Sequence, residues 1–319
     1  MTNFSRNGFT LIELIVAMAI SVVIAAFVFS FGSSLAGIWK NASGQIDAEL
    51  DANLALDQIA RDLESAIMLE KASGDVMFAV DMLSKEDISA IPLNDRLWKI
   101  GSASRPETLD VHLSNHNYGW AGAWLRFFSC QPSVNAVSYR IIRRPGFTDS
   151  STDRYVLNRS VVRQDHTLAA GWDITKGDYV DGSISRTSYD LAPNIKFPTI
   201  DNAFLENVVD FGVRLYVYEA GARTEDAPFG MRLVFPADEN SRLSDADRTH
   251  RGRARRNVTS ENRYPDVVEV FVRVLTQNGA DLLRELENGA GQSDYEAIVS
   301  SHSRVYRRTV SVAGTQSEQ

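Results

Sequence analysis

The first part of the chain is one continuous apolar segment. From Phe9 to Trp39 it holds a single ionisable side chain, Glu13, and no proline. At about 1.5 Å per residue, a helix over residues 9–31 is about 35 Å long. That length spans a hydrocarbon core of about 30 Å. The pattern therefore predicts a transmembrane helix over residues 9–35.

A helical pattern continues beyond the apolar run, with charged side chains between regularly spaced apolar ones. This is typical of an amphipathic helix that buries one face. We expect a single helix from about Phe9 to Met68, ending just before Ser73 and Gly74. Its second part, residues 36–70, is expected to pack on a sheet of the same chain, with a coiled-coil dimer as the alternative. The stripe consists of Ile46, Leu50, Leu54, Leu56, Ile59, Leu63 and Ile67.

After residue 70 the pattern changes to short alternating runs, which are typical of β-strands. Alternation is clearest in Val267–Thr276 and in Val208–Tyr218, and we expect these two runs to pair as antiparallel neighbours. A short helix is expected over Asp281–Leu286. The other predicted strands are Val76–Val80, Leu109–Leu113, Ala123–Phe128, Ala136–Ile142, Tyr155–Val162, Met231–Phe235 and Arg304–Val312.

These elements predict an α+β chain with one long N-terminal helix and a C-terminal antiparallel sheet domain. The sheet domain takes up residues 71–319, with insertions expected near residues 85–120 and 219–264. The length of 319 residues and the 44% share of apolar residues are sufficient for a substantial core.

Charge and cysteine content narrow the function classes. The net charge of −8 argues against nucleic acid as the main partner, because binding phosphates needs a basic field. The single cysteine, Cys130, rules out an internal disulfide and a cysteine-rich zinc site, and we interpret it as a buried or incidental thiol. No metalloprotease, phosphate-loop or nucleophile-elbow motif is present. No catalytic constellation is visible in the sequence, and we expect no cofactor.

Several clusters are given structural interpretations. The acidic group is expected to be a solvated turn rather than a calcium site. The histidine pair is expected on a strand and its turn, where it forms no metal site. The aromatic group is expected in the core. The arginine run is expected to be a solvated, mobile loop, with contact to DNA, an anionic envelope polymer or an acidic partner as the alternative. The acidic group consists of Asp238, Glu239, Asp245 and Asp247, and the histidine pair of His112 and His116. The aromatic group consists of Trp120, Trp124, Phe127 and Phe128, and the arginine run of Arg248, Arg251, Arg253, Arg255 and Arg256.

The residues before the apolar run are mostly polar, with Arg6 as their one charged side chain. Arg6 and the amino terminus favour a cytoplasmic N-terminus by the positive-inside rule. An ordinary secretory signal peptide has a shorter apolar core and a small-residue cleavage site after it, whereas here Gly8 comes before the run. A carboxylate such as Glu13 within an apolar helix is costly and usually has a function.

The sequence Gly8-Phe9-Thr10-Leu11-Ile12-Glu13 resembles the prepilin signature of type IV pilins and pseudopilins. The resemblance implies a pilin-like fold, and cleavage after Gly8 by a prepilin peptidase that also methylates the new amine of Phe9. It implies that Glu13 meets the amine of a neighbouring subunit and sets the filament register. The order of strands in the body loosely resembles W-type minor pilins, the J-type pseudopilin of type II secretion, and the Verru_Chthon cassette protein C group.

The resemblance implies a non-catalytic minor pilin or pseudopilin with a leader at residues 1–8. Its partners would be prepilin peptidase, other pilin or pseudopilin subunits and inner-membrane lipid. The chain would cross the bacterial inner membrane once, with a periplasmic body, and then join a pilus or pseudopilus, where its bulk suits the tip. Two alternatives are a membrane-anchored envelope enzyme or ligand-binding module with a prepilin-like leader, and a plain anchor that is never cleaved.

Overall fold

The structure is a computed structural model of the chain. It describes residues 10–69, 74–82, 123–145, 153–176, 179, 200–219, 230–235, 249–253, 262–287 and 295–312. The chain divides into two compact units, Met1–Asp47 and Ala48–Gln319, and each is described by itself.

The long helix α1 runs from Leu11 to Glu64. It ends four residues before the predicted Met68, because the chain beyond Glu64 bonds to a strand instead of continuing the helix. The Ile67 N–H donates to the Phe128 carbonyl over 2.9 Å, and the Cys130 N–H donates to the Ser65 carbonyl over 2.9 Å. The predicted long N-terminal helix is otherwise confirmed.

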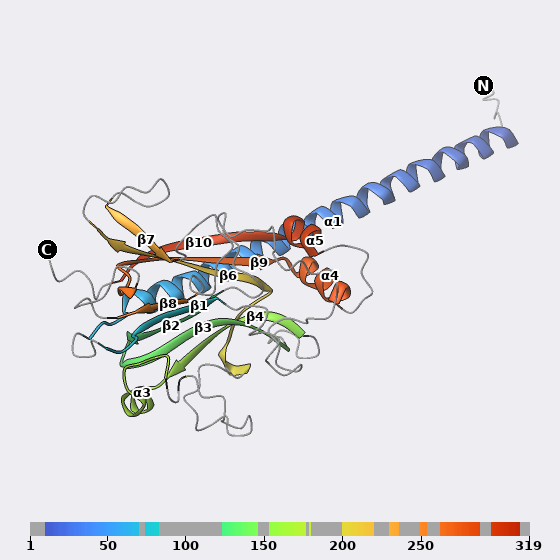
Figure 1. The fold of residues 1–319 in the computed structure, drawn as a ribbon. Coiled ribbons are helices and arrows are strands. Elements are labelled where there is room, and N and C mark those ends of the chain that lie inside the picture. Colours follow the sequence, from blue (N-terminus) through green and yellow to red (C-terminus); the bar gives the residue numbers. More distant parts are fainter. Residues whose placement is uncertain are drawn as a thin grey trace, which may run out of the picture. The chain divides into compact units, whose positions relative to one another are not determined.

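The second unit contains two antiparallel sheets (Figure 1). The larger has six strands in the order β5-β4-β3-β2-β1-β8 and the smaller has four, in the order β10-β9-β6-β7. The strands of the larger sheet are β1 (Phe78–Met82), β2 (Ala123–Cys130), β3 (Val134–Pro145), β4 (Asp153–Val162), β5 (Ala203–Glu206) and β8 (Thr249–Gly252). Those of the smaller sheet are β6 (Val208–Tyr218), β7 (Met231–Phe235), β9 (Val267–Leu275) and β10 (Ser303–Ser311).

Short helices lie between the strands. Helix α3 (Gln164–Ala170) follows β4, and a 3-10 turn, η4 (Ile200–Asn202), precedes β5. Helices α4 (Gln277–Glu287) and α5 (Tyr295–His302) come between β9 and β10. Helix α4 contains the helix predicted over Asp281–Leu286, and α3 and α5 were not predicted.

The central strand pairing follows the prediction. Strands β6 and β9 are antiparallel neighbours, with Val213 opposite Val270 and Leu215 opposite Val268. The α+β architecture, a long N-terminal helix followed by antiparallel sheets, is confirmed.

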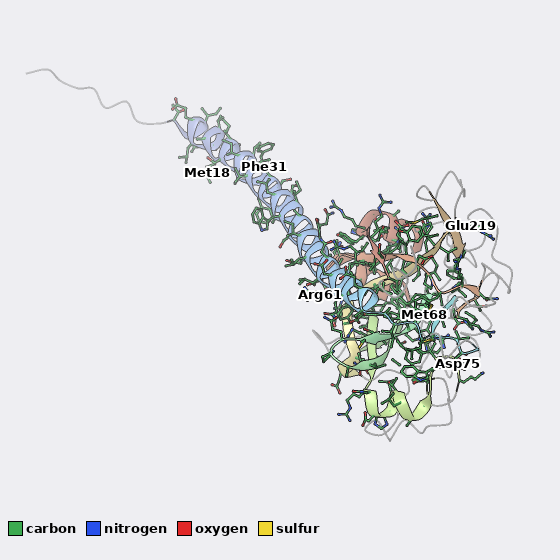
Figure 2. All side chains as sticks on the ribbon, turned by 90° about the vertical axis from the view of Figure 1, so that its left-hand side faces the viewer. Met18, Phe31, Arg61, Met68, Asp75 and Glu219 are labelled. Carbon is green, nitrogen blue, oxygen red and sulfur yellow. The ribbon has the colours of Figure 1, made fainter. Side chains whose placement is uncertain are left out.

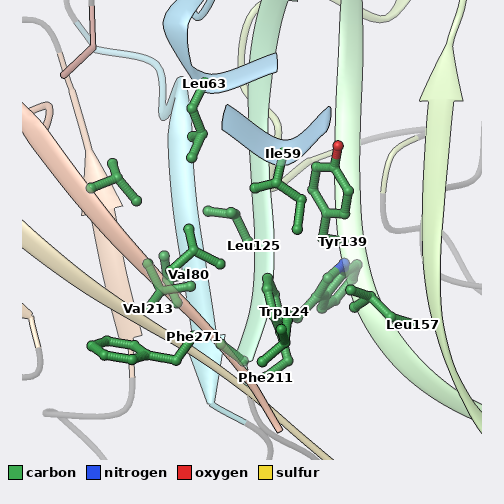
Figure 3. Close-up of a cluster of buried hydrophobic side chains, with 14 of the residues drawn as sticks. Ile59, Leu63, Val80, Trp124, Leu125, Tyr139, Leu157, Phe211, Val213 and Phe271 are labelled. Atoms are coloured by element: carbon green, nitrogen blue, oxygen red, sulfur yellow. The ribbon is translucent and has the colours of Figure 1, made fainter. Parts of the chain in front are cut away.

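The core of the second unit combines the last turns of α1 with both sheets (Figure 3). Ile59 and Leu63 of α1 are buried in the same cluster as Leu125 of the larger sheet and Val213 of the smaller one. The helix is therefore a core element of the body and not only an anchor.

The predicted apolar stripe on α1 divides into two parts. Leu56, Ile59 and Leu63 are buried, but Leu50 and Leu54 are 59% and 60% exposed. At about 100° per residue, positions 50 and 54 lie on the side of the helix opposite to positions 52, 56 and 59. The prediction that the whole stripe packs on the chain's own sheet is therefore wrong for its first part, and small Ala52 and Ala55 are buried instead.

One position of the arginine run differs from expectation, and of the two interpretations of Cys130, buried or incidental, the first is wrong. Arg251 lies in β8, which pairs with β1, and the residue is only partly exposed, so a solvated loop is wrong for that position. The backbones of Arg253 and Arg263 form an isolated parallel β-bridge. Cys130 is exposed and not buried.

The predicted core aromatics Trp124, Phe127 and Phe128 are buried, as expected. Other predictions fall outside the described residues: the strand Leu109–Leu113, the insertion near 85–120, His112, His116, Trp120, the acidic group of Asp238, Glu239, Asp245 and Asp247, and Arg248, Arg255 and Arg256.

Candidate functional site

The start of α1 is fixed by a reciprocal pair of side chains. The backbone N–H of Thr10 donates to Glu13 Oε2 over 2.9 Å, and the Thr10 hydroxyl donates to the same oxygen over 3.0 Å. In return, the N–H of Glu13 donates to Thr10 Oγ1 over 3.3 Å. This is a capping box, in which each side chain satisfies a backbone donor of the first helical turn.

The capping box was not predicted, although its signal, a threonine followed three residues later by a glutamate, is present in the sequence. It sets the first helical residue at Leu11. The peptide bond between Gly8 and Phe9 therefore precedes the cap of the helix. Arg6, Gly8 and Phe9 themselves lie outside the described residues.

The first part of α1 presents an apolar surface on all sides. The large apolar side chains between Leu11 and Trp39 are exposed by between 50%, at Leu35, and 81%, at Phe29. Figure 2 shows these side chains around the helix, with Met18 and Phe31 labelled. By length and composition α1 is able to cross a membrane. An apolar surface of this extent requires lipid or protein to cover it.

A buried polar network joins α1 to the larger sheet. Asp62, whose side chain is 3% exposed, accepts from the Tyr139 hydroxyl over 2.5 Å. Arg159 donates to both of its carboxylate oxygens, from Nε over 2.7 Å and from Nη2 over 2.9 Å. Gln58, one turn earlier, donates to Oδ1 over 3.0 Å. Such a bidentate pair fixes geometry as well as adding energy, so it sets the rotation of α1 against β3 and β4.

The same network shifts the pKa values of its members. Burial raises the pKa of Tyr139 well above its usual value, and the charge of Asp62 raises it further. Burial alone would lower the pKa of Arg159, but its hydrogen bonds and ion pair with Asp62 outweigh this and raise the pKa. The Tyr139 hydroxyl and the Arg159 guanidinium therefore stay protonated at physiological pH.

A second, exposed ion pair joins α1 to the smaller sheet. Arg308 Nη2 of β10 lies 3.1 Å from Asp57 Oδ1, with side chains 56% and 46% exposed. Nearby, burial and the charge of Glu49 raise the pKa of Tyr306, also on β10. The last strand of the body therefore lies against the helix that begins the chain.

The larger sheet carries a cluster of arginines around Trp124. The guanidinium carbons of Arg126 and Arg140 lie 3.9 and 4.6 Å from the centre of its ring. The indole N–H donates to Ser138 Oγ over 2.8 Å. Burial lowers the pKa of Arg140 to about 10. Cations stacked on an indole in this way are stabilised by the electrostatics of the ring.

One acidic residue pairs with an arginine of this cluster. Asp81 of β1 forms an ion pair with Arg126, and Arg251 Nη2 of β8 lies 2.5 Å from Asp81 Oδ1. These contacts explain why a strand forms in the polar arginine run, since Arg251 neutralises a carboxylate on the neighbouring strand. Among the described residues, no group of three or more His, Cys, Asp or Glu side chains is placed to hold a metal ion.

Residues 3–29 match the family model described as the prokaryotic N-terminal methylation motif. No curated protein and no solved structure matches the chain. The matched residues include Gly8-Phe9, the capping box of Thr10 and Glu13, and most of the apolar run before Phe31.

Proposed function

We propose that the chain, whose N-terminal methylation motif supports a place among the type IV pilin-like prepilins, is a non-catalytic minor pilin or pseudopilin subunit. The observation that carries this proposal is the apolar first part of α1, whose large side chains are exposed, with a cap directly after Gly8-Phe9. The proposed divisions are a leader at residues 1–8, a membrane and filament segment at 9–35, a segment at 36–70 that contains the rest of α1 up to Glu64, and a periplasmic body.

Processing is proposed at the peptide bond after Gly8. Glycine lets a protease bring its catalytic groups close to the backbone, because no side chain intervenes. This bond comes before the capping box of Thr10 and Glu13 in the sequence. Prepilin peptidase would then methylate the new amine of Phe9, four residues before Glu13.

Before processing, Arg6 and the amino terminus would hold the leader in the cytoplasm, with the body across the inner membrane. The subunit would then leave the lipid for a filament of other pilin or pseudopilin subunits. There Glu13 would pair with the amine of a neighbouring subunit and fix the axial register, because such a pairing offsets the cost of burying each charge. The bulk of the body suits a position at the tip.

The test of processing is the mass and N-terminal sequence of the chain isolated from membranes with and without prepilin peptidase. We expect the enzyme to remove residues 1–8 and to add one methyl group to Phe9. In Gly8→Val the leader should remain. Gly32→Val is the matched control, because a side chain at Gly32 meets nothing within 4 Å, and it should be processed normally. A wild-type chain that keeps residues 1–8 beside active peptidase would refute the proposal.

The role of Glu13 is tested with Glu13→Gln. Glutamine can still close the capping box, so the start of α1 and its processing should be preserved. The charge that meets a neighbour's amine is removed, and co-assembly with other pilin subunits, measured by co-sedimentation of filaments, should be lost. Undiminished assembly of the processed variant would show that Glu13 acts only as a cap.

A further inference from the structure

Beyond the apolar segment, α1 keeps an exposed apolar face. Leu50 and Leu54 lie one turn apart and are 59% and 60% exposed, while Ala52 and Leu56 on the other side of the helix are buried. One turn before Leu50, Ile46 continues the spacing and is 67% exposed. Exposed leucines spaced by four residues form one ridge on a helix, which is the unit of helix–helix packing. The described residues of the body leave this ridge uncovered.

Acidic side chains border the ridge. At about 100° per residue, Glu49 and Asp51 lie on its two sides, next to Leu50. Asp57 continues the line of the ridge after Leu54, where the apolar positions end, and pairs with Arg308. Residues 41–60 contain four acidic residues and no lysine or arginine. Arg308 offsets the charge of Asp57, so the negative border of the ridge lies beside Leu50, at Glu49 and Asp51.

This charge pattern selects the partner. Two copies of this chain joined ridge to ridge would bring acidic borders together, and like charges facing each other oppose association. A helix with apolar positions at the same spacing and lysine or arginine on its flanks would be attracted instead.

We infer that the ridge of Leu50 and Leu54 binds the helix of a different subunit, one whose flanking positions are basic, and that it disfavours a second copy of this chain. The inference rests on the proposed function, since it names which kind of subunit lies beside α1. An anionic lipid surface is a poorer match, because the acidic border would be repelled by it.

A charge-reversed copy of the chain provides a defined probe. All chains carry Cys130→Ser, to remove the exposed native thiol, and Leu54→Cys as the cross-linking position. The reversed copy adds Glu49→Lys and Asp51→Lys, and one chain of each pair bears an epitope tag. The matched control adds Asp165→Lys and Asp201→Lys, two exposed positions outside α1. Pairs are co-expressed with prepilin peptidase, and disulfide formation is measured in isolated membranes.

We expect the original and reversed chains to cross-link about tenfold more than either like pair at low salt, which corresponds to about 1.4 kcal/mol. The preference should disappear near 1 M salt, where the screening length is about 3 Å. Adding Leu50→Ala to both chains should reduce the mixed product several-fold. The control copy should cross-link with the original no more than the original does with itself.

Equal cross-linking of mixed and like pairs would overturn the inference, and this is also the result expected if the ridge lay on lipid. A mixed product equally strong with the control copy would overturn it too, since the attraction would then be non-specific. Processing of residues 1–8 is measured in the same samples. Failed processing refutes the proposed function, whereas failed pairing of processed chains refutes only the choice of partner.

Discussion

The buried carboxylate of Asp62 gives the sharpest test of how α1 is held to its body. Asp62→Ala removes four hydrogen bonds, from the Tyr139 hydroxyl, from two nitrogens of Arg159 and from Gln58. Removing one partner of a buried ion pair costs about 3–5 kcal/mol. The side chain of Arg159 is 28% exposed, so water relieves part of its lost pairing. We therefore expect a loss of about 3 kcal/mol, at the lower end of that range.

Asp57→Ala is the matched control. Asp57 lies five residues earlier on the same helix and also pairs with an arginine of a sheet, but both side chains of that pair are about half exposed. Exposed pairs contribute at most about 1 kcal/mol. The comparison therefore contrasts a buried carboxylate that accepts from Tyr139, Arg159 and Gln58 with an exposed one that pairs with an arginine.

The assay is urea unfolding of the full chain in detergent micelles, followed by tryptophan fluorescence. With a slope near 3 kcal/mol per molar urea, Asp62→Ala should lower the midpoint by about 1 M and Asp57→Ala by no more than about 0.3 M. In an Arg159→Met background, Asp62→Ala should cost less, because no guanidinium is left unpaired. Equal midpoints for the two single variants would refute the assignment of the network as the attachment of α1.

Two further predictions concern packing and pH. A methyl group at Gly279 would lie 2.5 Å from His302 Cβ, so Gly279→Ala should lower the free energy of unfolding by about 1–3 kcal/mol. In the control Gly74→Ala the methyl group meets nothing within 4 Å, and the free energy of unfolding should change by less than about 0.5 kcal/mol. Equal effects of the two substitutions in urea unfolding would contradict the packing described. Burial raises the pKa of Tyr139, and burial together with the charge of Glu269 raises the pKa of Tyr216 to about 12. Above about pH 10 the unfolded chain therefore loses protons that the folded chain keeps. The free energy of unfolding should then fall by up to about 1.4 kcal/mol per pH unit for each tyrosine. Tyr139→Phe should reduce that slope between about pH 10 and 12, and an unchanged slope would argue against its contribution.

The strands that could be predicted are those whose signal is local. Alternating apolar residues predicted strands β9 and β6. They also predicted that the two strands pair, because neighbouring antiparallel strands with matched apolar faces bury those faces together. Strand β8 was missed because its stability depends on a distant partner. Arg251 is placed by Asp81, which lies 170 residues earlier in the chain, and no local pattern reports such a contact.

The prediction for the second part of α1 was wrong for a different reason. The predicted stripe steps by only two residues from Leu54 to Leu56, which at about 100° per residue crosses to the other side of the helix, so Leu50 and Leu54 were wrongly assigned to the sheet. The body instead takes Ala52 and Ala55, whose small side chains are buried, and leaves the larger pair outside. At the N-terminus the residue types of the prepilin signature were readable, but the capping bonds between Thr10 and Glu13 required coordinates.

The contact of β10 with α1 has a consequence for the order in which the body matures. Residues 57 and 308 are 251 positions apart in the sequence, and β9, the centre of the smaller sheet, needs β10 as its outer neighbour. A ribosome releases Ile59 and Leu63 long before the strands that bury them. The growing chain therefore has no finished core until β10 emerges, and such long-range closure is slow. Changes that end the chain before Ser303, and so remove β10, should therefore yield chains that are degraded rather than shortened folded subunits.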